Sequence, residues 1–210
     1  MKKKLLAVLM IIGIMLLMAS CSIPLVGDFF ESENSLGKTN NTAVAIAEAM
    51  KDYLKSKNKE DYALYGIEMI LNSDSNGMVK LYYSAAAASE AEYSDICVAE
   101  VDSKTGHVER FGKANYTKDG ILPYQLVKES DPFDGGSLPI DSGKAISAAV
   151  RAFSGNPDFH YDYVQILLNA PSGLEQYEIE FISMLNESIY YCTVDAVSGA
   201  VLASSTGSLE

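Results

Sequence analysis

The stretch VDAVSGAV (Val194–Val201) decides the fold, because it encodes a tight β-hairpin turn and has a copy upstream. The copy, VDSKTGHV (Val101–Val108), lies 93 residues earlier and has valine, aspartate, a hydroxyl residue, glycine and valine at the same places. In such turns the aspartate accepts backbone N–H bonds and the glycine supplies a positive φ. The matched residues are therefore expected to shape turns and not to catalyse a reaction: Asp102, Thr105, Gly106, Asp195, Ser198 and Gly199.

Upstream of each turn, the hydrophobic pattern predicts one helix followed by strands that end in the hairpin. Apolar residues recur at helical spacing over 42–54 and again from Ile146 to Phe153, and β-patterned runs follow both segments. We therefore expect an α+β fold with two repeats, 42–115 and 140–206, each one helix packed on a four-stranded antiparallel sheet. Residues 116–139 would form a linker. Repeats of about 70 residues are near the lower limit for a self-sufficient core, so the two are expected to pack together.

The sequence also indicates which face of the second sheet is wet. Tyr177, Ile179 and Phe181 alternate with Glu178 and Glu180, so the apolar side chains should face the helix and the glutamates should lie on an acidic, solvated face. Tyrosines occupy adjacent or alternating strand positions, where an exposed ring suits protein recognition. The alternative is that tyrosine simply favours strands.

The second repeat resembles a PepSY domain. The similar segments are IDSGKAISAAVRAFSG (Ile140–Gly155), YEIEF (Tyr177–Phe181) and IYYCTVDAVSGAVL (Ile189–Leu202); the first repeat matches more loosely and has an Ala-rich insertion at 85–91. PepSY domains occur in propeptides of thermolysin-like metalloproteases and in envelope proteins, and the family is thought to restrain peptidases. The resemblance implies a non-enzymatic, extracytoplasmic regulatory or binding module. The expected layout is also similar to the tandem units of β-lactamase inhibitory protein.

The N-terminus has the features of an export signal. Three lysines at 2–4 precede an apolar run, Leu5–Met18, which is shorter than the about 20 residues that span a bilayer. The following residues up to Cys21 resemble a bacterial lipobox. We therefore expect a lipoprotein signal peptide at 1–20, a lipidated tether at 21–41, and acyl chains such as palmitate that anchor Cys21 to the extracytoplasmic face of the cell membrane. The alternative is a plain signal peptide followed by a stray cysteine.

The chain is strongly acidic. It has 16 Lys and Arg against 28 Asp and Glu, a formal charge of −12, and loss of three lysines with the signal peptide makes the exported part −15. Phosphate contacts require a basic face, so nucleic-acid binding is excluded. The acidity predicts a partner whose contact surface is neutral or basic.

Few residues suggest reactive or metal chemistry. The chain lacks the common nucleophile, zinc-helix and phosphate-loop motifs, so neither an enzyme nor a cofactor is expected. Asp158, His160 and Asp162 would share one face of a strand, which makes them weak metal candidates; a solvated strand face is the alternative. Outside the cytoplasm, Cys97 and Cys192 could form a disulfide if their strands meet, or remain buried free thiols.

Together these observations predict a lipid-anchored, non-enzymatic envelope protein. It would bind a secreted peptidase or another envelope protein and restrain or chaperone it. The alternative is a lipoprotein that binds a small ligand or the cell wall in a pocket between the repeats. A metal-dependent protein based on His160 is a third hypothesis.

Overall fold

The computed structural model describes residues 36, 42–72, 77–85 and 90–209. The expected signal peptide, the lipidation site Cys21 and the tether, apart from Leu36, lie outside these residues and stay predictions. None of the described helices is both long and apolar enough to cross a membrane.

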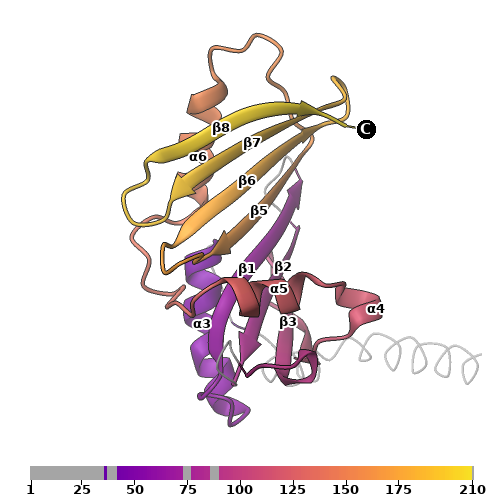
Figure 1. Ribbon diagram of the computed structural model, residues 1–210, viewed down its shortest axis with the longest axis vertical. Coiled ribbons are helices and arrows are strands. Elements are labelled where there is room, and N and C mark those ends of the chain that lie inside the picture. Colours follow the sequence, from indigo (N-terminus) through magenta and orange to yellow (C-terminus); the bar gives the residue numbers. More distant parts are fainter. Residues whose placement is uncertain (1–35, 37–41, 73–76, 86–89, 210) are drawn as a thin grey trace, which may run out of the picture. The chain divides into compact units, whose positions relative to one another are not determined.

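The elements follow the chain in the order helix, four strands, two short helices, helix, four strands (Figure 1). The first half contains α3 (Ala43–Ser56), β1 (Ala63–Asn72), β2 (Gly77–Ser84), a 3₁₀ turn (Tyr93–Asp95), β3 (Ile96–Asp102) and β4 (Val108–Lys113). Two short helices, α4 (Tyr116–Asp119) and α5 (Leu122–Glu129), come next. The second half contains α6 (Ser142–Phe153), β5 (Tyr163–Asn169), β6 (Gln176–Ser183), β7 (Ser188–Asp195) and β8 (Val201–Ser208).

The expected pair of four-stranded sheets is wrong, because all eight strands form one antiparallel sheet. Its strand order is β4-β3-β2-β1-β5-β6-β7-β8, and β1 joins β5 from the pair Gly66↔Asn169 to the pair Asn72↔Tyr163. Two separate sheets would leave the backbone N–H and C=O groups of β1 and β5 unpaired along an open edge. Their pairing satisfies these groups, so the chain forms one continuous sheet and not two repeats with a sheet each.

One hydrophobic core joins α3 and α6 to the same face of this sheet. Ile46 and Met50 of α3 and Ala149 and Phe153 of α6 belong to one cluster with buried side chains of β1 to β7. Phe153 contacts Phe181 of β6 edge to face, at 6.2 Å between ring centroids. Burial of such side chains contributes about 1.5–3 kcal/mol each, so the two helices and the sheet depend on each other for stability.

The opposite face of the sheet is covered by α5 over part of its width. Leu126 packs with Tyr82 and Val98, while Val127 packs with a neighbouring group that includes Tyr65. In Figure 1 this helix lies in front of the strands of the first half, whereas no helix lies in front of β6, β7 and β8. The segment 116–139 is therefore not only a connection, since part of it forms a second layer on the first half.

Candidate functional site

We define the open face as the side chains of β5, β6 and β7 that point away from α6. They alternate with core residues such as Tyr177 and Phe181. They are Tyr163, Gln165, Leu167, Asn169, Gln176, Glu178, Glu180, Ile182, Ile189, Tyr191, Thr193 and Asp195. Tyr163 is 48% exposed and Tyr191 is 39% exposed. The open face thus offers aromatic rings to solvent on a rigid sheet, as the tyrosine pattern suggested.

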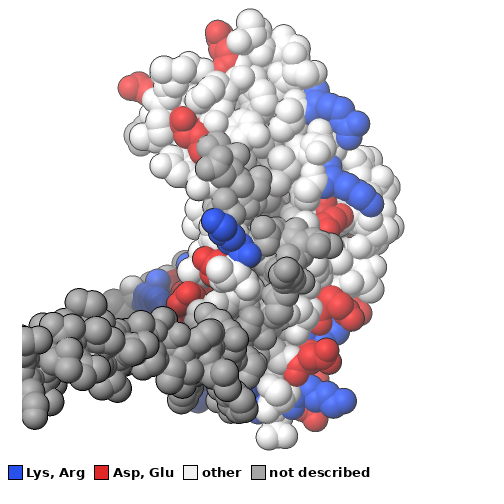
Figure 2. Space-filling model, turned by 180° about the vertical axis from the view of Figure 1, so that it is seen from behind, with Lys and Arg blue, Asp and Glu red and all other residues white. Residues whose placement is uncertain are grey.

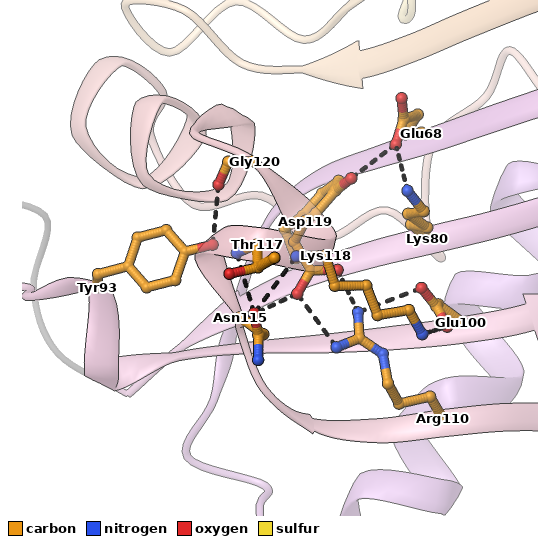
Figure 3. Close-up of polar contacts among 11 residues, drawn as sticks. Glu68, Lys80, Tyr93, Glu100, Arg110, Asn115, Thr117, Lys118, Asp119 and Gly120 are labelled. Atoms are coloured by element: carbon orange, nitrogen blue, oxygen red, sulfur yellow. Dashed lines mark hydrogen bonds and ion pairs between the residues drawn. The ribbon is translucent and has the colours of Figure 1, made fainter.

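On the first half, the same side of the sheet carries buried carboxylates that are paired with cations. Glu68 accepts a hydrogen bond from the Tyr82 hydroxyl at 2.7 Å, and Lys80 Nζ lies 3.6 Å from Glu68 Oε2 (Figure 3). Glu68 also accepts a hydrogen bond from Gln165 Nε2 at 3.2 Å. Because Gln165 belongs to β5, this bond also links the two halves of the sheet. Glu68 is satisfied within the chain.

Arg110 and Lys118 neutralise the other two buried carboxylates of the first half (Figure 3). Arg110 bonds both Glu100 and Asp119, and Lys118 Nζ donates to Glu100 at 2.8 Å. Asp119 also accepts the backbone N–H of Asn115 at 2.7 Å. Burial raises the pKa of Asp119, but these hydrogen bonds outweigh it, so its pKa is lowered. The network holds α4 against β3 and β4, and we assign it a structural role.

The carboxylates of the open face lack such cations. Glu178 Oε1 accepts from Asn169 Nδ2 and from Gln176 Nε2, each at 3.0 Å, and both donors are neutral. Within the described part of the chain, neither Glu178 nor Glu180 forms an ion pair. Burial and the neighbouring Glu178 charge raise the pKa of Glu180. The open face therefore carries negative charge that this part of the chain leaves unbalanced.

Figure 2 views the molecule from behind, on the side of α3 and α6, and shows basic side chains interspersed with acidic ones. On α3, for example, Lys51 pairs with Glu48 and with Asp134. The helix side is thus electrostatically mixed. The contrast makes the unbalanced glutamates of the open face the more distinctive feature for recognition.

The two predicted turns have closely similar geometry. Asp102 Oδ1 accepts from the Thr105 N–H at 2.7 Å and from the Thr105 hydroxyl at 2.8 Å, and Gly106 has φ +70°. In the second turn, Asp195 Oδ1 accepts from the Ser198 N–H and hydroxyl, and Gly199 has φ +75°. These hydrogen bonds lower the pKa of both aspartates. The side chains hold the β3–β4 and β7–β8 turns.

The weak metal candidates precede β5 and do not lie on a strand. His160 Nδ1 is 4.0 Å from Asp162 Oδ2 and 3.4 Å from the Ser183 hydroxyl, while Asp162 accepts the Met184 N–H at 2.8 Å. Among the described residues, no group of three or more His, Cys, Asp or Glu side chains is arranged to hold a metal ion. Asp158 is therefore not brought into a joint site with the other two.

Cys97 and Cys192 are both buried and free. Cys97 lies on β3 and Cys192 on β7, and four strands separate these two in the sheet. With strands about 4.8 Å apart, the two residues are roughly 24 Å from each other, whereas a disulfide requires α-carbons within about 7 Å. This sheet therefore excludes a bond between them.

The sequence pattern placed Glu178 and Glu180 on the acidic face, but it missed their neighbours. Asn169 and Glu129 join the same region because α5 lies beside the end of β5. No local pattern marks this approach, since the two residues are 40 positions apart. Residues from α5 could be assigned to the site only once its position was known.

Comparisons with known proteins give one structural likeness. No family model matches the chain, PepSY included, and no curated protein matches it. A crystal structure of a candidate lipoprotein from Clostridium difficile 630 is similar, with a TM-score of 0.50 and 12% sequence identity. The match covers 83% of this chain and 99% of that one. At this identity, the likeness shows that the two chains share a fold.

Proposed function

We propose that this protein is a lipid-anchored envelope protein that binds another protein through the open face. The observation that carries the proposal is the half-buried, unbalanced Glu178 and Glu180 beside the exposed rings of Tyr163 and Tyr191. Rigid aromatic side chains give large contact areas at low entropic cost. A partner with a neutral or basic contact surface fits this charge.

Lipid anchoring is supported from two directions. The segment before Cys21 resembles a lipobox, and the similar Clostridium difficile structure is named a candidate lipoprotein. We therefore place the protein on the extracytoplasmic face of the cell membrane. The PepSY resemblance of the sequence suggests two further details. The protein would bind its partner without catalysing a reaction, and the partner that it restrains or chaperones would be a peptidase.

Site-specific crosslinking on intact cells tests the function. A photoreactive phenylalanine derivative would replace Tyr191 or Tyr163 on the open face, or Lys55 on the exposed side of α3 as the matched control. We expect one envelope protein to be captured from both open-face positions and not from position 55. Capture of the same proteins from all three positions, or none from any, would contradict the proposal.

The proposal that the partner is a peptidase needs a separate measurement. Secreted peptidase activity would be compared in cells with the protein, without it, and with a Cys21→Ala variant that removes the expected anchor. Restraint predicts a rise in activity on deletion, and chaperoning predicts a fall. If peptidase activity is unchanged and the captured protein is not a peptidase, the protein binds a partner, but that partner is not a peptidase.

A second candidate function is binding of a small apolar molecule. A cavity of about 330 Å³ lies between α3 and the segment 132–136, and not between the two halves of the chain as the sequence pattern predicted. Tyr83 lines it and is 3% exposed. Saturable fluorescence of 1-anilinonaphthalene-8-sulfonate that Ala47→Leu abolishes would support this function.

A further inference from the structure

A groove lies where α5 meets the open face. Its volume is about 250 Å³, and α5, the end of β5 and the middle of β6 form its walls. Leu126 and Leu167 give it an apolar side, while Glu129, Asn169 and Glu178 give it a polar side. The groove is a continuation of the proposed binding surface toward the first half.

Asn169 provides an acceptor that this part of the chain does not use. The residue is 7% exposed, and its Nδ2 donates to Glu178 Oε1 at 3.0 Å. Because a carboxylate only accepts, this bond fixes the orientation of the amide. Asn169 Oδ1 is then buried without a hydrogen-bond donor in the described part of the chain. Leaving a buried carbonyl oxygen unpaired is unfavourable, so a donor supplied by a ligand would stabilise it there.

The charge of the groove points in the same direction. Glu129 and Glu178 line it, and neither forms an ion pair within the described residues. On the first half of the sheet, by contrast, Lys80, Arg110 and Lys118 balance the buried carboxylates. The groove therefore combines a neutral acceptor and two carboxylates from three different elements, and the described chain supplies no cation to them.

We propose that this groove receives a lysine or arginine side chain of the protein partner, an inference that rests on the proposed function. The aliphatic stem of such a side chain can lie along Leu126 and Leu167 while its charged end meets the acceptors. Charged hydrogen bonds of this kind are shorter and stronger than neutral ones. The partner would thus present at least one basic residue at the border of its contact surface.

Titration with a lysine peptide tests the groove directly. Fluorescein-labelled tetralysine would be added to the full-length protein in detergent, and anisotropy would report binding. The variant Glu178→Gln removes one carboxylate of the groove, and Glu187→Gln makes the same change at the exposed β6–β7 turn. We expect Glu178→Gln to weaken binding at least fivefold and Glu187→Gln to leave it within a factor of two. Thermal unfolding of both variants would check that each is folded.

Three results would overturn the inference. These are absence of tetralysine binding, equal weakening by both variants, and equal binding of fully acetylated tetralysine. Failure of the proposed function is distinguishable, because capture at Tyr191 on intact cells does not depend on the groove. If the Glu178→Gln protein still captures the partner with unchanged affinity, the proposed function stands, but the groove takes no part in it.

Discussion

The hydroxyl of Ser142, the first residue of α6, accepts a hydrogen bond from the backbone N–H of Ala43, the first residue of α3, at 3.1 Å. The two residues are 99 positions apart, and both are buried. The first N–H groups of a helix have no partner inside the helix, so one helix here satisfies the start of the other. This contact links the N-terminal ends of α3 and α6.

The first prediction concerns this hydrogen bond. Ser142→Ala should lower the free energy of unfolding by about 1–2 kcal/mol, because it leaves a buried N–H without an acceptor. Urea denaturation followed by circular dichroism would measure the change. Ser147→Ala is the control, since that exposed hydroxyl bonds only the Gly143 carbonyl of its own helix. Equal midpoints for the two variants would contradict the prediction.

Local features of the fold were predictable from the sequence. Residue type at each position determines whether a turn, a helix face or a strand face can form. The sequence therefore predicted the turns at Asp102 and Asp195 and the alternation of Tyr177 with Glu178. It did not predict the pairing of β1 with β5. Backbone hydrogen bonds join these strands, and any two open edges of suitable length can make them. The unpaired Oδ1 of Asn169 could not be predicted from the sequence either, because its burial depends on where α5 lies.

The second prediction addresses the ion network under α4. The Asp119 side chain is fully buried and bonds Arg110, so Asp119→Asn should cost about 3 kcal/mol of stability. Lys118→Met, at a side chain that is 54% exposed, should cost less than about 1 kcal/mol. The lowered pKa of Asp119 adds a pH signature, because stability is lost as pH falls through that pKa. Guanidinium titrations between pH 7 and pH 3 would show this loss in the wild type and a smaller one in Asp119→Asn.

The third prediction concerns the β7–β8 turn. Gly199 has φ +75°, and an added Cβ would lie 3.2 Å from Ile140 Cδ1, so Gly199→Ala should destabilise the protein by about 1–2 kcal/mol. Gly112→Ala on β4 meets no atom within 4 Å and is the matched control. Thermal denaturation of both variants measures the difference. If Gly112→Ala destabilises the protein as much as Gly199→Ala does, the backbone conformation of the turn is not the cause.

The fourth prediction concerns the thiols. Protein purified without reductant should titrate two thiols, Cys97 and Cys192, with Ellman's reagent in urea, besides any free Cys21. The folded protein should react far more slowly, because both side chains are buried and burial raises the pKa of Cys192. Loss of both thiols after unfolding in the absence of reductant would show that they had been oxidised.

The fifth prediction uses the pH dependence of Glu180. Its pKa in the folded protein is raised by burial and by Glu178, so folding favours its protonated form. Its contribution to stability is therefore fully present below the ordinary glutamate pKa and is lost as pH rises through the raised value. Glu180→Gln removes this loss, so the variant should be more stable than the wild type at neutral pH, and its stability should change less between pH 4 and pH 7.

Urea denaturation at several pH values would measure this effect, with Glu187→Gln as the exposed control. A basic ligand should change this pH dependence. Tetralysine bound beside Glu178 would favour ionised Glu180, so it should stabilise the wild type more at pH 7 than at pH 4. A Glu180→Gln variant less stable than the wild type at pH 7 would show that this carboxylate has a hydrogen-bonding role that outweighs the cost of its charge.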